Sequence, residues 1–162
     1  MSDSSNSSLP AGVILAVDWG TRRVGLAVSD SSHSMVFPLK VLQRSSETAE
    51  RIGLRKIVME NGARAIVIGW PLMVSGQSGQ NGRIIVKWAE SVCLPTGVPL
   101  FFADERYSSV LADETLRETG RKASQRKALI DSMAAREFLQ EVLSGATRIW
   151  PWGTNPPEIN LN

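Results

Sequence analysis

The hydrophobic positions near the start of the chain fall into short continuous runs. Residues 13–17 and 24–28 are two such runs, and the Gly, Thr and Arg residues between them predict a tight hairpin of buried strands. A third strand is predicted over residues 35–42. Pro38 places that strand at a sheet edge or a bulge, because proline cannot donate to a strand ladder. The pattern therefore predicts a three-stranded antiparallel meander.

Strand and helix patterns alternate after the meander. Buried strands are predicted over residues 65–69 and 98–103. The predicted helices span residues 46–60, 82–92, 108–118 and 124–143. Such alternation is typical of parallel strands joined by right-handed crossovers. We therefore expect an α/β fold with a five-stranded mixed sheet, made of the meander and two parallel strands, and with helices on both faces.

The composition separates both ends from this domain. Residues 1–10 are rich in serine and predict a disordered leader. Residues 144–162 hold three Pro, two Trp and two Gly and predict a tail without a core of its own. The folded domain is therefore expected over residues 11–143. Because the pattern contains neither a signal peptide nor a transmembrane run, we expect a cytoplasmic protein with no membrane partner.

Cysteine and histidine each occur once, as Cys93 and His33. A disulfide framework and a Cys/His zinc site are therefore excluded, and any catalysis must use carboxylates, hydroxyls, Lys, Arg or bound ions. The formal net charge is +2 and the calculated pI is about 9.0, which permits a nucleic-acid partner without requiring one. Cys93 and Trp70 are expected to pack in the interior, whereas Trp150 and Trp152 could pack on the domain or contact a partner.

The last predicted helix carries an acidic residue on its apolar stripe. Asp131, Ala135, Phe138 and Val142 follow an i, i+4, i+7, i+11 spacing and therefore lie on one face. An unpaired carboxylate on a core-facing stripe costs several kcal/mol. Spacing alone leaves two interpretations open: Asp131 belongs to a functional site, or it pairs with an Arg or a hydroxyl on a neighbouring strand.

Further carboxylates follow the predicted buried strands. Asp18 ends the first strand, and Asp104 and Glu105 follow the strand over 98–103. Ligands bind at the carboxyl edge of α/β sheets, and neighbouring strand residues point to opposite faces, so one of the pair is expected to join Asp18. An oxygen-rich group of this kind suits Mg²⁺ or Mn²⁺. The alternative for Asp104, Glu105 and Arg106 is a solvated loop with a local ion pair.

Basic residues are concentrated near the same positions. A carboxylate site surrounded by Lys and Arg suits a polyanionic substrate whose phosphates need neutralising, although a charge cluster alone is usually a solvated helix end. The candidate phosphate-binding residues are Arg22, Arg23, Arg83, Arg106, Arg121, Lys122, Arg126 and Lys127.

Four motifs carry a resemblance to a known family. They are Asp18-x-Gly20-Thr21-x-x-x-Gly25-x-Ala27-x-Ser29-Asp30, Gly69-x-Pro71-Leu72 with Gly76, Asp104-Glu105-Arg106-x-Ser108, and Ile130-Asp131-x-x-Ala134-Ala135. In this order and spacing they resemble the YqgF/RuvX family, whose members are described as pre-16S rRNA nucleases or as Holliday junction resolvase-like proteins.

The resemblance implies an RNase H-like fold and a divalent-metal-dependent nuclease site that uses Mg²⁺ or Mn²⁺. Carried over by motif, Asp18, Glu105 and Asp131 are the catalytic residues, and these three together with Asp104 are the candidate metal ligands. Other RNase H-like nucleases place a carboxylate at the end of the strand over 65–69. This chain has Gly69 there, so the second ligand must come from Asp104 or Glu105.

The leading hypothesis is an endonuclease that processes the 5′ end of precursor 16S rRNA during ribosome biogenesis. A four-way DNA junction nuclease is the alternative within the same class. A non-catalytic nucleic-acid-binding factor of ribosome assembly is an alternative of another class. The Asp-x-Gly-Thr motif also occurs in actin-like ATPases, but the second half that would enclose a nucleotide is not evident. The expected partner is structured nucleic acid, with precursor rRNA favoured over branched DNA, and both a monomer and a homodimer stay open.

Overall fold

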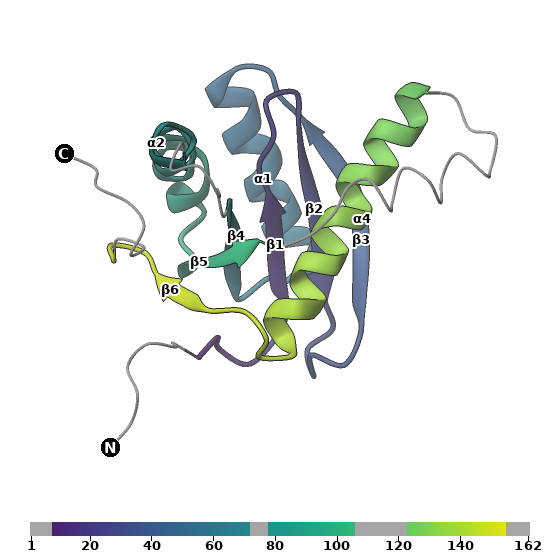
Figure 1. The fold of residues 1–162 in the computed structure, drawn as a ribbon, viewed down its shortest axis with the longest axis vertical. Coiled ribbons are helices and arrows are strands. Elements are labelled where there is room, and N and C mark those ends of the chain that lie inside the picture. The colour runs from purple at the N-terminus through teal and green to yellow at the C-terminus, as the bar shows by residue number, and fades with distance from the viewer. Residues whose placement is uncertain (1–7, 72–77, 106–122, 155–162) are drawn as a thin grey trace.

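The computed structural model describes residues 8–71, 78–105 and 123–154, and a single mixed sheet forms its centre (Figure 1). The sheet has the strand order β3-β2-β1-β4-β5-β6. Its strands are β1 Ile14–Asp18, β2 Arg23–Ser29, β3 Val36–Gln43, β4 Ala65–Pro71, β5 Leu100–Glu105 and β6 Ile149–Pro151. The helices are α1 Glu47–Asn61, α2 Ser78–Trp88 and α4 Ala123–Leu143, with a π-helical turn η1 Ala89–Cys93 and a 3₁₀ turn η2 Leu94–Thr96 after α2.

The meander and the parallel pairing are as predicted. β1 pairs with β2 and β2 pairs with β3 in antiparallel fashion, whereas β1, β4 and β5 are parallel. β3 lies at one edge of the sheet and holds Pro38 opposite Ala27, beside a register shift between Val24 and Leu26. The edge position of β3 is therefore confirmed.

The predicted strand count of five is wrong, because the sheet has six strands. β6 lies in the segment expected to be a tail and pairs antiparallel with β5, with Trp150 opposite Phe102. Trp150 is buried, and the ring of Trp152 stacks on Phe102 with 5.8 Å between ring centroids. A three-residue strand that contains a proline has no readable period, and it forms here because two indoles pack on the domain.

The two long helices begin where the sequence predicts. The Ser46 side chain caps α1 by accepting from the backbone N–H of Ala49, and Gly62 ends the helix with a φ of 63°. α4 spans 21 residues, and Figure 1 shows it crossing β2 and β3 on the front of the sheet. α2 begins at Ser78, four residues before the predicted start at 82. The predicted helix over 108–118 lies outside the described residues.

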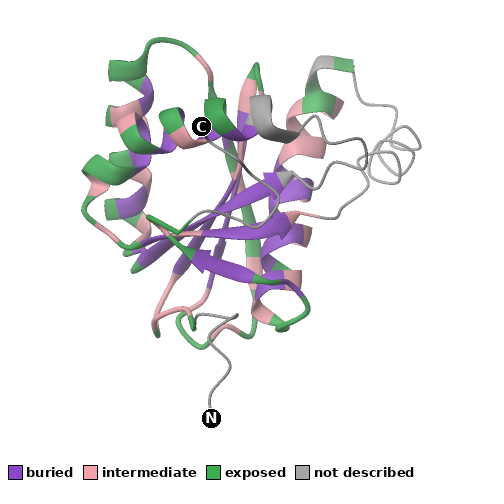
Figure 2. Ribbon diagram, turned by 60° about the vertical axis from the view of Figure 1, so that its left-hand side comes forward, coloured by how far each residue is buried: buried purple, intermediate pink, exposed green. Residues whose placement is uncertain are grey.

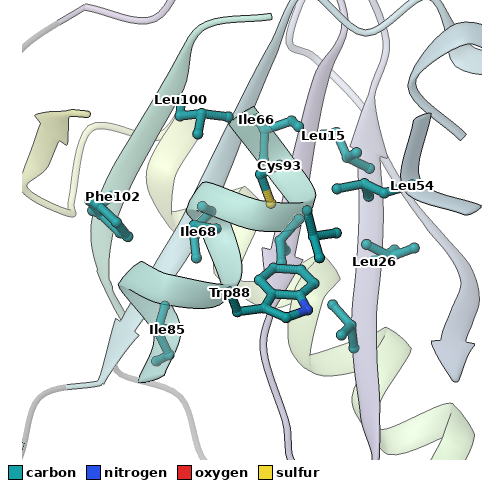
Figure 3. Close-up of a cluster of buried hydrophobic side chains, with 14 of the residues drawn as sticks. Leu15, Leu26, Leu54, Ile66, Ile68, Ile85, Trp88, Cys93, Leu100 and Phe102 are labelled. Carbon is teal, nitrogen blue, oxygen red and sulfur yellow. The ribbon is translucent and has the colours of Figure 1, made fainter. Parts of the chain in front are cut away.

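Alternation along the strands divides the core into two layers, and Figure 2 shows the buried strands between the helices. Leu15, Val17, Ile66 and Ile68 face α1 and α2, where Cys93 and Trp88 complete the larger cluster (Figure 3). On the other face the strands meet α4, whose apolar stripe contributes Ala135, Phe138, Leu139 and Val142. Trp70 and Cys93 are buried as predicted, and burial raises the pKa of the Cys93 thiol. Within the described residues, no helix combines the length and apolar character needed to cross a membrane.

Candidate active site at the carboxyl edge of the sheet

Two carboxylates from different strands meet at one edge of the sheet. Asp18 is the last residue of β1 and Glu105 is the last residue of β5. Ala16 and Ala103 lie two residues earlier on these strands and both face α4, so the period of two directs Asp18 and Glu105 to that face as well. A hydrogen bond joins the two carboxyl groups. The structure therefore brings together two of the carboxylates that the sequence singles out.

A glycine on the strand between them makes room for this contact. Val17 pairs with Ile68, so Gly69 follows beside Asp18, and Gly69 in turn pairs with Ala103 of β5. A Cβ at position 69 would lie only 2.6 Å from Oε2 of Glu105. The Glu105 carboxylate thus occupies the space that a side chain at position 69 would take. Glu105 therefore places a carboxylate beside Gly69, in agreement with the expectation that the second ligand comes from Asp104 or Glu105.

Burial and mutual proximity shift the titration of both carboxyl groups. The pKa of Asp18 is raised from 3.8 to about 6: desolvation is the largest cause, the hydrogen bond from Glu105 opposes it, and the charge of Asp131 adds to it. Desolvation raises the pKa of Glu105 well above its usual range, and the charge of Asp18 and the hydrogen bond between them raise it further. Both carboxyl groups therefore keep their protons to a higher pH than they would in water.

Asp104 lies on the opposite side of the sheet from Asp18. Asp104 lies two residues after Phe102 and four after Leu100, so its side chain points to the same face of the sheet as theirs. Leu100 and Phe102 pack in the cluster beneath α1 and α2. Its backbone N–H donates to the carbonyl of Arg148, in the segment that leads into β6. The alternative that these acidic residues form a solvated loop is wrong for Asp104 and Glu105, because both belong to β5.

Asp131 reaches the same edge from α4 and is ion-paired there. Its Oδ2 accepts from Nε of Arg23, the first residue of β2, at 2.7 Å. The Asp131 side chain is 32% exposed and that of Arg23 is 20% exposed. Asp131 is therefore at the open end of the apolar stripe, and it makes the arginine pair that the spacing left open as an alternative.

Close backbone packing holds α4 at this position. Gly25 of β2 pairs with Asp18 of β1, and a Cβ at position 25 would overlap the carbonyl oxygen of Asp131. The same Cβ would lie 2.9 Å from the carbonyl carbon of Asp131 and 3.5 Å from the Cβ of Ala135. Only glycine permits this approach of helix and strand. Gly25 thus sets the distance between Asp131 and the β1 carboxylate.

A buried network that the sequence did not predict fixes the turn after Asp18. Arg44 donates from Nη1 to the carbonyl of Gly20 at 3.0 Å and from Nε to Oε1 of Glu50 at 2.9 Å. Glu50 is buried and also accepts from the indole Nε1 of Trp88 at 2.7 Å. The Arg44 guanidinium lies 5.1 Å from the ring centroid of Trp19. No local pattern signals this network, because its members come from separate elements.

The predicted phosphate-binding residues are only partly grouped at this edge. Arg22 lies exposed in the turn beside Arg23, and Arg126 and Lys127 precede Asp131 on α4. Arg83 lies on α2, which packs on the other face of the sheet. Arg106, Arg121 and Lys122 lie outside the described residues.

The donor chemistry of this edge suits a hard divalent cation. Asp18 and Glu105 present carboxylate oxygens, and Oε2 of Glu105 is buried without a hydrogen-bond partner among the described residues. The same part of the chain contains no group of three His, Cys, Asp or Glu side chains arranged to hold a metal ion. Asp18 and Glu105 therefore form a two-carboxylate core, and Asp131 stands beside it in its pair with Arg23.

Comparison with solved structures identifies the fold. Thermus thermophilus RuvC in complex with a Holliday junction substrate superposes with a TM-score of 0.50 at 14% identity, and the match covers 86% of this chain and 99% of that one. The chain thus has an RNase H-like α/β fold, with carboxylates at the carboxyl edge of its sheet.

The chain belongs to the RuvX family, described as Holliday junction resolvase, whose model matches residues 12–145. A protein of Maridesulfovibrio salexigens named "Putative pre-16S rRNA nuclease" is 36% identical over 133 residues, covering 82% of this chain and 98% of that protein. A protein of the same name from Koribacter versatilis is 36% identical over 135 residues, covering 82% of this chain and 86% of that protein. The family resemblance that the motifs indicate is confirmed.

Proposed function

We propose that this protein is a divalent-metal-dependent endonuclease that processes the 5′ end of precursor 16S rRNA. The observation that carries the proposal is the hydrogen-bonded pair of Asp18 and Glu105, which is set over Gly69 at the carboxyl edge of the sheet. Burying two carboxyl groups against each other opposes folding, and such an arrangement is typical of a functional site. The names of the relatives support precursor 16S rRNA as the substrate.

Three carboxylates bind the metal ion in this proposal. Asp18 and Glu105 hold Mg²⁺ or Mn²⁺ between β1 and β5, and Asp131 contributes from α4. When bound there, the cation supplies water activation and stabilisation of the leaving oxygen. Gly69 keeps the Glu105 carboxylate in place, and the network around Arg44 holds the turn that follows Asp18. Asp104 faces the other side of the sheet, so we assign it no part in metal binding.

The cations around the site position the substrate by its phosphates. Arg22, Arg23, Arg126 and Lys127 lie in the β1–β2 turn, at the start of β2 and at the start of α4, on either side of Asp131. Contacts of this kind fix the register of a nucleic acid without reading its sequence. Arg106, Arg121 and Lys122 stay predicted members of the same surface. A cytoplasmic location and a monomeric or homodimeric state also stay predictions.

Cleavage of a DNA junction is the second candidate, and the description of the family as Holliday junction resolvase favours it. The discriminating experiment incubates the purified protein with a precursor 16S rRNA fragment and with a four-way DNA junction, in Mg²⁺, in Mn²⁺ and in EDTA. We expect metal-dependent cleavage of the RNA and little cleavage of the junction. Preferential cleavage of the junction would support the resolvase alternative, and binding of either substrate without cleavage would support a non-catalytic assembly factor.

A further inference from the structure

The ion pair between Arg23 and Asp131 joins β2 and α4 at the active-site edge of their contact. Arg23 opens β2, and Asp131 lies 108 residues further along the chain on α4, which crosses β2 (Figure 1). Nε of Arg23 donates to Oδ2 of Asp131 at 2.7 Å. A guanidinium at this distance satisfies the carboxylate and places a fixed positive charge beside it. Asp131 is therefore already occupied by a cation that belongs to the protein.

This pair holds Asp131 beside the two buried carboxylates but turned to Arg23. Asp131 is near enough to Asp18 for its charge to act there, yet the described residues contain no group of three acidic side chains arranged to hold a metal ion. A divalent cation that takes Asp131 as a ligand must displace the Arg23 guanidinium from Oδ2 or share the carboxylate with it, and in both cases the guanidinium charge repels the cation. Without substrate, only Asp18 and Glu105 are available to the cation.

We propose that Arg23 is a positioning residue that keeps Asp131 away from the metal until a phosphate of the nucleic-acid substrate draws its guanidinium aside. The inference rests on the proposed function. The Arg23 side chain is 20% exposed, so a phosphate oxygen can reach it without unfolding β2. Guanidinium groups pair with phosphate in the same two-bond geometry as with carboxylate. Exchange of one anion for the other then releases Asp131 to join Asp18 and Glu105.

The consequence is coupling between metal and substrate. Because the phosphate removes a competitor for Asp131, substrate raises the affinity for metal, and metal raises the affinity for substrate by the same factor. An ion pair with both partners partly exposed is weak enough to be exchanged by a phosphate. The complete site therefore assembles only where a phosphodiester is present.

Calorimetric titration of the full chain with Mn²⁺, without substrate, tests this proposal. We expect Arg23→Gln to bind Mn²⁺ about fivefold more tightly than the wild type, which is the release expected from a partly exposed ion pair. Arg22→Gln is the matched control, because it removes the same charge from the adjacent exposed position. The double variant Arg23→Gln with Asp131→Asn is expected to lose the gain. Circular dichroism establishes that each variant is folded.

A second titration includes a phosphorothioate-substituted RNA hairpin that resists cleavage. We expect the hairpin to raise the Mn²⁺ affinity of the wild type by a similar factor and to leave that of Arg23→Gln unchanged. Equal or weaker Mn²⁺ binding by Arg23→Gln, or an equal effect of the hairpin on both proteins, would overturn the inference. A wild type that binds no Mn²⁺ and cleaves neither substrate would instead refute the proposed function, so the two failures are distinguishable.

Discussion

Replacing Asp18 with Asn is expected to abolish cleavage and at the same time to stabilise the metal-free protein. Cleavage should fall by about a thousandfold or more, equivalent to about 4 kcal/mol in the activation free energy. The free energy of unfolding should rise by about 3 kcal/mol at pH 8, because a pKa raised from 3.8 to about 6 opposes folding once the group ionises. A residue retained only for stability would produce the opposite result.

The sign of the stability effect follows from the raised pKa. The folded protein binds the Asp18 proton more tightly than the unfolded chain does, so this group favours folding below about pH 4 and loses that effect as the pH rises through about 6. We therefore expect little difference between Asp18→Asn and the wild type at pH 4, a gain for the variant that grows between about pH 4 and pH 6, and a constant gain from there to pH 8.

Urea unfolding in EDTA at both pH values measures this difference. Glu60→Gln is the control, since the Glu60 side chain is 60% exposed on α1 and its replacement should change neither cleavage nor stability appreciably. Destabilisation by Asp18→Asn at pH 8 would show that contacts within the protein stabilise the ionised Asp18 carboxylate. That result would contradict the proposal that a bound cation stabilises this charge.

Adding one methyl group at Gly25 or at Gly69 should have contrasting effects. A Cβ at position 25 overlaps the backbone of α4 at Asp131, and backbone cannot rotate away, so Gly25→Ala should destabilise the fold by about 3 kcal/mol. A Cβ at position 69 meets only the end of the Glu105 side chain, which can turn aside. Gly69→Ala should keep the stability within about 1 kcal/mol while lowering the Mn²⁺ affinity by about tenfold or more.

Thermal unfolding and Mn²⁺ titration of both variants separate packing from site geometry. If Gly69→Ala binds Mn²⁺ as the wild type does, the position of the Glu105 carboxylate over residue 69 has no role in metal binding. If Gly25→Ala is as stable as the wild type, the close approach of α4 to β2 does not determine where Asp131 lies.

Local patterns in the sequence predict most of the elements that build the site. The hairpin around Asp18, the buried strand that carries Gly69 and the stripe that carries Asp131 are all readable, because a single period or apolar run defines each of them, although the strand runs on to Pro71. The capping of α1 by Ser46 and Gly62 is readable for the same reason.

Features that depend on tertiary pairing are not readable from local patterns. β5 runs two residues beyond the predicted end at 103, and only the observed register shows that Glu105, rather than Asp104, faces Asp18. β6 depends on its pairing with β5. The choice of Arg23 as the partner of Asp131 depends on where α4 crosses β2. In each case the deciding contact joins residues that are far apart in the sequence and do not belong to one hydrophobic pattern.

Calorimetric titration of the wild type, Asp18→Asn and Glu105→Gln with Mn²⁺ at pH 5.5 and pH 7.5 tests the central claim most directly. Because both carboxyl groups must lose their protons to bind a cation and both pKa values are raised, Mn²⁺ should bind the wild type at pH 7.5 and about tenfold more weakly at pH 5.5. Both variants should lose this binding. Mn²⁺ binding that is equal in all three proteins and independent of pH would contradict a metal site formed by Asp18 and Glu105.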